Sequence, residues 1–516
     1  MQGRKDIQPK MLYQVSIDSL VPTDNFYRLL SQTLDLNFLY KATAMYYGTE
    51  GQESIDPVVF FKICLIGYLN NINSDRRLMA YCSNCLDTRW YLKYDIDEDL
   101  PWHSTISRTR QLYGEEVFLS LFQKVLSMCV QKGMIRGKRQ AVDSAYIKAN
   151  ASMDSLVEKE VIEDSSAYVN ELNEGSEYKV TSERKKLVER HHTWKVKEYK
   201  DMPGHVDNPK QVDEQGNTIR PRYLSNHTHY SPTDPDAKIS TKPGKPRQLN
   251  YAGQIAVDDA HHVITAACAS TAGSKDSENL PEILQQAQEN FKHIGLKIAQ
   301  ITADAGYSSG TALKYCEEHN IDAYIPNFGQ YKPEREGFIY NAELNQYECI
   351  KEGGNKAILS YKGIKTDSKG YEKKSFRSSE TVCSKCPLRL QCCGVATKFK
   401  KLEESIDKPY YDRMHHKLTN NPSYAKKISR IRSKTVEPVL GTLINFLNMK
   451  KINSRGMTQA NKHVLMAALT YNLKKLMKFT RHKANSIAQA MQKIEATAQN
   501  TFRFFIDYIT TLTTPI

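Results

Sequence analysis

The sequence lacks an apolar run of the length that a membrane-spanning helix needs, and no apolar segment follows its charged first residues as in a secretory signal. It also lacks an even, regularly spaced set of cysteines, because its eleven cysteines are an odd number in 516 residues. These absences argue against a membrane protein and against a disulfide framework. We therefore expect a cytoplasmic protein with reduced thiols and no membrane partner.

Acidic residues are the minority among the charges: 58 Asp and Glu stand against 72 Lys and Arg, which gives a formal net charge of +14. A positive surplus favours a polyanionic partner, because Lys and Arg release counterions when they bind phosphate backbones. A basic protein without such a partner is the alternative. The chain length predicts about three or four structural units.

The spacing of apolar residues predicts an all-α N-terminal region followed by an α/β core. Residues 1–135 have helical periodicity, whereas period-two alternation begins after Lys138. An antiparallel hairpin is predicted for residues 248–258 and 263–269. After it we expect a helix at 280–287, a strand at 297–304, a helix at 309–318 and a strand at 321–326. This order predicts a mixed sheet with covering helices.

Two segments interrupt that pattern. Residues 154–246 are polar, charge-mixed and rich in Pro, Asn and His, which predicts a partly disordered insertion. Residues 327–430 form a basic insertion that contains Gly and Cys. We therefore expect a helical domain at 1–135, a catalytic domain at 136–480 with these two insertions, and a helical tail at 481–516.

Three acidic residues are candidates for catalysis. Asp143 and Asp304 each end an apolar run, where we expect a strand terminus that a metal ion can reach from solvent. Glu437 follows a basic run at the predicted start of a helix. Three carboxylates make a hard-oxygen site that suits Mg²⁺ or Mn²⁺ and phosphoryl transfer. The alternative is a turn residue or helix cap at each position.

Basic residues beside these acids or at predicted helix starts are candidates for contacts with DNA phosphates, and one tyrosine follows Asp304 closely enough to offer an aromatic surface. The alternative is that the basic side chains are only solvated. The candidate DNA contacts are Arg76, Arg77, Arg108, Arg110, Lys148, Tyr307, Arg430, Arg432, Lys434 and Lys450.

A cysteine group in the second insertion is a candidate for structural zinc. Cys383 and Cys386 have the two-residue spacing of a zinc knuckle, and Cys392 and Cys349 are the further candidate ligands. The alternative is a small loop with reduced thiols. The pair Cys82 and Cys85 has no partner pair nearby, and we interpret it as packing.

Several strings in the chain resemble bacterial insertion-sequence transposases of the DDE type. They are the strand with Asp143, the string Ala303–Tyr307, the Val-Glu-Pro around Glu437, and Tyr471–Lys474. In the N-terminal region, Ser54–Pro57 and Ser74–Leu78 are similar to the helical domain of that group. The similarity covers most of the chain apart from residues 154–246.

This resemblance implies a function for the chain. It implies an RNase H-like catalytic domain in which Asp143, Asp304 and Glu437 hold two metal ions. The expected reaction is cleavage at the terminal inverted repeats of an insertion sequence, followed by strand transfer into target DNA. Such transposases work as paired complexes, so we expect at least a homodimer on DNA and association with the nucleoid.

One departure from the group concerns the residues around Glu437. Many relatives have a tyrosine seven residues before the glutamate, an arginine four before it and a lysine seven after it. This chain has Arg430, Ser433 and Ile444 at those positions. Two other functions therefore stay open: a metal-dependent nuclease that cuts without joining, or an inactive DNA-binding protein. Part of a dimer interface is expected at the aromatic tail, residues 502–509.

Overall fold

The computed structural model describes residues 15–158 and 246–481, with short gaps at 49, 51–53, 293, 330 and 368–369, together with residue 483 and short pieces between 211 and 241. The aromatic tail at 502–509 lies outside these residues, as does most of the predicted insertion at 154–246.

The N-terminal region is helical, as predicted. Asp56 caps its central helix by accepting hydrogen bonds from the backbone N–H of Val58 (2.6 Å) and Val59 (3.1 Å), and Pro57 occupies the first turn. That helix is buried on nearly all sides. The elements are α1 (Ile17–Leu20), α2 (Phe26–Thr33), α3 (Phe38–Thr43), η1 (Ala44–Tyr46), α4 (Pro57–Leu69), α5 (Asp75–Asn84), α6 (Leu86–Leu92), α7 (His103–Leu112) and α8 (Glu115–Gln131).

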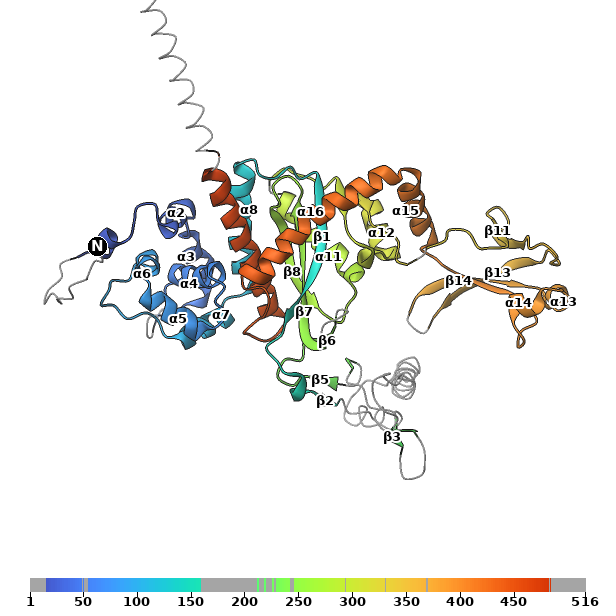
Figure 1. Ribbon diagram of the computed structural model, residues 1–516, viewed down its shortest axis with the longest axis horizontal. Coiled ribbons are helices and arrows are strands. Elements are labelled where there is room, and N and C mark those ends of the chain that lie inside the picture. The colour runs from blue at the N-terminus through green and yellow to red at the C-terminus, as the bar shows by residue number, and fades with distance from the viewer. Residues whose placement is uncertain are drawn as a thin grey trace, which may run out of the picture.

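A mixed six-stranded sheet forms the centre of the molecule, which confirms the predicted α/β class (Figure 1). Its strands are β1 (Arg139–Lys148), β6 (Lys238–Ser240), β7 (Gln248–Asp258), β8 (Ile264–Thr271), β9 (Gln300–Thr302) and β10 (Asp322–Tyr324). The main order is β8-β7-β1-β9-β10, and β6 pairs with the first residues of β7. β7 is antiparallel to both of its neighbours, β8 and β1, whereas β9 and β10 run parallel to β1.

Helices cover both faces of this sheet. Antiparallel partners share a face, so Asp143 shares one face with Ile255, and Ser144 shares the other with Gln254. α16 (Pro422–Phe446) contacts the face with Asp143 and lies across β1 in Figure 1, whereas α11 (Asp276–Lys292) packs on the face with Gln254. α12 (Gly310–Glu318) and α15 (Lys408–Asn420) flank the parallel edge, and a helix at residues 457–481 lies beside α8.

A second sheet occupies much of the predicted insertion at 327–430 and projects from the side of the core (Figure 1). It is an antiparallel meander of β11 (Phe338–Asn341), β12 (Gln346–Cys349), β13 (Ile358–Thr366), β14 (Glu372–Ser378) and β15 (Lys401–Ser405). Two short helices, α13 (Glu380–Cys383) and α14 (Arg389–Cys393), connect β14 to β15. Helix α16, which Asn421 caps, begins at Pro422, within the range predicted for this insertion.

The boundary of the first insertion also changes. Strand β6 lies inside the predicted range 154–246 but pairs with β7, so this part belongs to the main sheet. The other described pieces of that range are η2 (Met153–Ser155) and two ribbons. The ribbons pair β2 (Val157–Glu158) with β5 (His229–Tyr230), and β3 (Gln211–Val212) with β4 (Thr218–Ile219).

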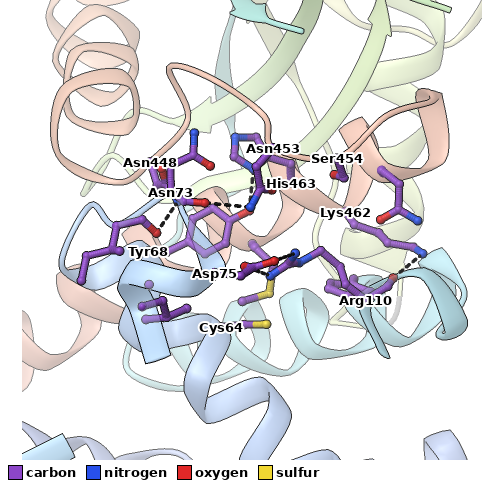
Figure 2. Close-up of a pocket in the computed structure, with 16 residues that line it drawn as sticks. Cys64, Tyr68, Asn73, Asp75, Arg110, Asn448, Asn453, Ser454, Lys462 and His463 are labelled. Carbon is purple, nitrogen blue, oxygen red and sulfur yellow. Dashed lines mark hydrogen bonds and ion pairs between the residues drawn. The ribbon is translucent and has the colours of Figure 1, made fainter. Parts of the chain in front are cut away.

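The helical region and the main sheet share one continuous hydrophobic core, which runs from Tyr27 to Leu476. Polar contacts add to their junction, as Figure 2 shows. The hydroxyl of Tyr68 lies 2.7 Å from Nδ1 of His463, and Nζ of Lys462 donates to the backbone carbonyl of Arg110 at 3.1 Å. Burial lowers the pKa of His463 to about 4. The N-terminal helices are therefore packed onto the core rather than attached by a linker.

Candidate active site and nucleic-acid contacts

The pairing of β1 with β9 brings two of the three predicted acids together. These strands are parallel, with Ala141 opposite Thr302. Two residues further along each chain stand Asp143 and Asp304, so both carboxylates lie at the same edge of the sheet. Burial raises the pKa of Asp143, and the nearby charge of Asp304 raises it further, against the opposing effect of Arg432.

The two aspartates differ in their local structure. Asp304 follows the last residue of β9, as predicted, and its Oδ1 accepts a hydrogen bond from the backbone N–H of Gly306 at 2.9 Å. It thereby caps η3 (Ala305–Tyr307). The prediction of a strand terminus for Asp143 is wrong, since it is the fifth residue of β1 and β7 pairs with it. Its parallel neighbour β9 ends before that point, but the Asp143 side chain is still only 18% exposed.

Glu437 lies in the middle of α16, so its predicted position at a helix start is wrong. The basic run before it is helical, because α16 has already begun at Pro422. The helix passes over β1, where Arg432 connects two of the acids. Its Nη1 lies 2.9 Å from Oδ2 of Asp143, and its Nη2 lies 3.6 Å from Oε1 of Glu437. The side chain of Arg432 is 15% exposed, and it lies between the largely buried Asp143 and Glu437, which is 60% exposed.

The donor set suits a hard divalent cation, because carboxylate oxygens are the ligands that Mg²⁺ and Mn²⁺ prefer. Within the ranges that the structure describes, no group of three or more His, Cys, Asp or Glu side chains is close enough to hold a metal ion. At the candidate acids, the guanidinium of Arg432 lies between Asp143 and Glu437 and balances their charge. A cation held by all three acids would take over that neutralising role.

A buried hydrogen-bonded chain behind Asp304 was not predicted from the sequence. The Tyr307 hydroxyl donates to Oε1 of Gln254 at 2.5 Å, and Nε2 of Gln254 donates to Oδ1 of Asp276 at 3.1 Å. Tyr307 and Gln254 are both fully buried. The prediction that Tyr307 offers DNA an aromatic surface is therefore wrong, and its ring instead packs the Asp304 segment against β7.

Gly306 occupies a crowded position between two carboxylates. A Cβ atom at this residue would lie 3.0 Å from Oδ1 of Asp304 and 3.6 Å from Oδ2 of Asp276. A side chain there would therefore press on the candidate catalytic acid. The position also shows that Asp276, the first residue of α11, lies close to the candidate site. In the sequence, the only signal for Asp276 is the turn-like Gly273-Ser274 before a helix.

Most of the predicted DNA-contacting side chains are exposed: Arg76, Arg77, Arg108, Lys148, Arg430, Lys434 and Lys450. At the end of β1, the backbone N–H of Lys148 donates to the carbonyl of Lys450 at 3.1 Å, so two separate segments bring their lysines together there. Arg430 and Lys434 extend the basic surface along α16 toward Glu437.

Two predicted DNA contacts have other roles in the structure. The side chain of Arg110 is only 18% exposed and makes a bidentate ion pair with Asp75, with its Nη1 at 2.9 Å from Oδ2 and its Nη2 at 2.7 Å from Oδ1 (Figure 2). The prediction that it contacts DNA is wrong, because this guanidinium is committed to the junction between α5 and α7. Arg432, by contrast, lies inside the candidate site.

The cysteine candidates Cys349, Cys383, Cys386 and Cys392 line one pocket in the second sheet, together with Cys393. Cys82 is buried in α5, as the packing interpretation requires. All eleven cysteines are free thiols. Across the described segments, no helix combines the length and apolarity needed to cross a membrane.

Two family models that describe transposase domains match parts of the chain. The family described as "Transposase domain (DUF772)" matches residues 15–112, and the family described as "Transposase DDE domain" matches residues 353–477. The second range contains Glu437 but neither aspartate. No curated protein matches the chain.

Among solved structures, the cryo-EM structure of a piggyBac transposase synaptic complex with hairpin DNA is similar at a TM-score of 0.28 and 10% identity. The match covers 95% of this chain and 84% of that chain. A TM-score this low does not establish a shared fold.

Proposed function

We propose that this chain, which belongs to the DDE-type transposases, binds the terminal inverted repeats of an insertion sequence, cleaves DNA there and joins the ends to a target. The observation that carries the proposal is the placement of two acids at one end of the paired strands, with a third linked to them by an arginine. Parallel pairing of β1 with β9 puts Asp143 beside Asp304, and α16 brings Glu437 to the same edge through Arg432.

The sheet order supports an RNase H-like catalytic domain for this reaction. In the order β8-β7-β1-β9-β10, three antiparallel strands are followed by two parallel ones, with helices on both faces. That arrangement is the one that the resemblance to DDE transposases implies. The first acid then lies on the central strand, the second at the end of the neighbouring parallel strand, and the third on a helix that crosses them.

The family generally uses divalent metal ions. We propose that Asp143, Asp304 and Glu437 would hold two Mg²⁺ or Mn²⁺ ions, which supply Lewis-acid activation of water or a DNA 3′-hydroxyl and stabilise the leaving oxygen. The chain's own residues prepare this site. Gly306 and the buried chain of Tyr307 and Gln254 fix the Asp304 carboxylate, and Arg432 is placed to contact a phosphate when it leaves its acidic partners.

We further propose two DNA-contacting surfaces. Lys148, Lys450, Arg430 and Lys434 flank the acids and would hold the cleaved strand, since phosphate contacts position a nucleic acid without reading its sequence. Arg76 and Arg77 at the start of α5 and Arg108 on α7 are exposed and would contact the terminal repeat. Joining two ends to one target needs two such sites, so the active species should hold at least two chains.

The test of this function uses the full-length protein, Mg²⁺ and DNA carrying the element's end, with the products sized on a denaturing gel. Asp304→Ala should lose at least about 1,000-fold in cleavage rate while it still binds the end DNA. Glu318→Gln is the matched control, because Glu318 is an exposed acid on the neighbouring helix α12. Near-normal cleavage by Asp304→Ala would refute the site.

The products also separate the alternatives. Joined target DNA supports the transposase, and cut ends without joining support a nuclease. Binding with neither product supports an inactive DNA-binding protein.

A binding experiment tests the N-terminal surface in the intact chain. Arg76→Ala combined with Arg77→Ala should weaken end binding about tenfold or more and reduce its dependence on salt, because phosphate contacts release counterions. Lys314→Ala on α12 is the control, since Lys314 is an exposed cation outside the proposed surface. Unchanged affinity in the double variant would contradict this surface.

A further inference from the structure

The second sheet concentrates the cysteines of the chain in one place. Cys349 ends β12, Cys383 ends α13, Cys386 lies in the turn that follows, and Cys392 and Cys393 end α14. All five side chains line the same pocket, although they come from three stretches of the chain. Six cysteines elsewhere are distributed among the helices and strands of the main core.

The backbone of this pocket has the form of a knuckle. The N–H of Cys386 donates to the carbonyl of Cys383 at 3.2 Å, which turns the chain between the two thiols. Cys383 is buried, and its Sγ accepts a hydrogen bond from the Ser378 hydroxyl at 3.1 Å. Thiolates at a two-residue spacing, joined by a second pair of ligands, are the usual donors for tetrahedral zinc.

The surrounding sheet has little else to stabilise it. Its hydrophobic core consists of four buried residues: Phe338, Tyr347, Leu359 and Phe376. The helices α13 and α14 have only four and five residues, too short for a stable helix in water without tertiary support. Small modules of this kind usually need a metal or a disulfide to fold, and the thiols here are free.

The positive charge around the pocket suits a zinc ion with four thiolate ligands. Lys351, Arg389 and Lys400 line it together with the cysteines, and Nζ of Lys400 donates to the carbonyl of Cys392 at 2.7 Å. A zinc ion with four thiolates carries net negative charge, which these cations would offset.

We propose that Cys349, Cys383, Cys386 and Cys392 bind one structural zinc ion that holds α13 and α14 against β12 and β14. Among the described residues these four thiols do not yet form a group close enough to hold an ion. Zinc binding therefore requires their side chains to rotate toward the centre of the pocket that they line. Cys393 is not assigned as a ligand, because it directly follows Cys392, and two adjacent cysteines do not have the spacing at which zinc ligands usually occur. This proposal is independent of the catalytic function.

The first measurement is the zinc content of the purified full-length protein by mass spectrometry, with one zinc per chain expected. Metal-free protein titrated with Co²⁺ should develop the visible absorption of tetrahedral thiolate ligation. Wild-type protein that neither retains zinc nor gives this spectrum would overturn the proposal, whatever the behaviour of any variant.

Matched serine variants then test the ligand set. Cys386→Ser and Cys349→Ser should lose the bound zinc and become sensitive to protease between residues 331 and 405. Cys393→Ser, one residue from a proposed ligand, and Cys85→Ser, in the other two-residue pair, should retain it. Full zinc retention in Cys386→Ser, or loss of zinc in Cys393→Ser, would refute the assignment of ligands.

Discussion

The two sheets of this chain differ in what holds them together. The six-stranded sheet is covered by helices on both faces and belongs to a core that also includes the N-terminal helices. The five-stranded sheet has a core of four buried residues and leaves large apolar side chains exposed, among them Ile339, Ile358 and Ile364. Hydrophobic burial therefore explains the stability of the first sheet but not that of the second.

This difference separates two tasks within one molecule. Two of the candidate catalytic acids, Asp143 on β1 and Asp304 after β9, belong to the buried sheet, where close packing restrains side chains. The third, Glu437, lies on α16, which packs on that sheet. The five-stranded sheet is inserted between β10 and α15, so it can vary without disturbing the pairing of β1 with β9. A local metal site is a suitable way to stabilise such an addition, since it needs few residues.

One pair of core truncations tests this difference between the two sheets. Of the changes predicted here, these have the largest expected effect on stability. Ile255 on β7 and Leu359 on β13 are both fully buried. Ile255→Ala should cost about 2–5 kcal/mol and lower the main unfolding transition, because it opens a cavity in the continuous core. Leu359→Ala should instead increase hydrogen exchange within residues 338–405 and leave that transition nearly unchanged. Equal shifts of the main transition would show that both sheets unfold as one unit.

The sequence predicted the parts of the site that depend on local patterns. Alternation identified β1, and the apolar run before Asp304 identified the segment of β9, but their parallel pairing was not predicted and comes from the structure. The helix starts at Ser74 and Ser309 were also recognisable, since both serines are N-caps.

Side-chain exposure could not be predicted in the same way, because it depends on contacts between distant segments. Arg108 and Arg110 stand two residues apart on α7, yet only Arg110 meets Asp75 across the junction with α5. Tyr307 is buried because Gln254, on another strand, accepts its hydroxyl hydrogen bond. The length of α16, which places Glu437 in the middle of the helix, likewise depends on packing against the sheet.

A substitution at Gly306, with a smaller expected effect, tests the claim that local packing fixes the position of the Asp304 carboxylate. Gly306→Ala would place a Cβ atom 3.0 Å from Oδ1 of Asp304, which is close enough to displace that carboxylate. We expect cleavage to slow about 10- to 100-fold, with end binding and the unfolding temperature nearly unchanged. Gly114→Ala in the N-terminal region is the matched control, because its Cβ atom would press on the carboxylate of Glu116, an exposed residue that is not one of the candidate acids. Equal cleavage by both variants would contradict the claim.

The prediction with the smallest expected effect concerns two carboxylates that each pair with an arginine, Asp143 with Arg432 and Asp75 with Arg110. Burial raises the pKa of Asp143 despite Arg432. Burial also acts on Asp75, but the hydrogen bonds and charge of Arg110 outweigh it and lower the pKa of Asp75. Ionisation of Asp143 therefore costs stability above its folded-state pKa, whereas ionisation of Asp75 contributes stability above its unfolded pKa of about 3.9, which is lost as the pH falls through the folded-state value.

The unfolding temperatures of Asp143→Asn and Asp75→Asn, measured across pH, test whether ionisation of these two residues has opposite effects on stability. At pH 7.5, Asp143→Asn should keep or slightly raise the unfolding temperature, by less than the roughly 2–4 °C that 1 kcal/mol gives in larger domains. That gain should vanish as the pH falls through the folded-state pKa of Asp143, because the wild-type carboxyl is then protonated too. Asp75→Asn should lower the unfolding temperature at pH 7.5, since it leaves Arg110 without its charged partner. A clear loss of stability in Asp143→Asn would show that the ion pair of Asp143 with Arg432 stabilises the fold. It would contradict the expectation that the ionised Asp143 carboxylate destabilises the folded protein.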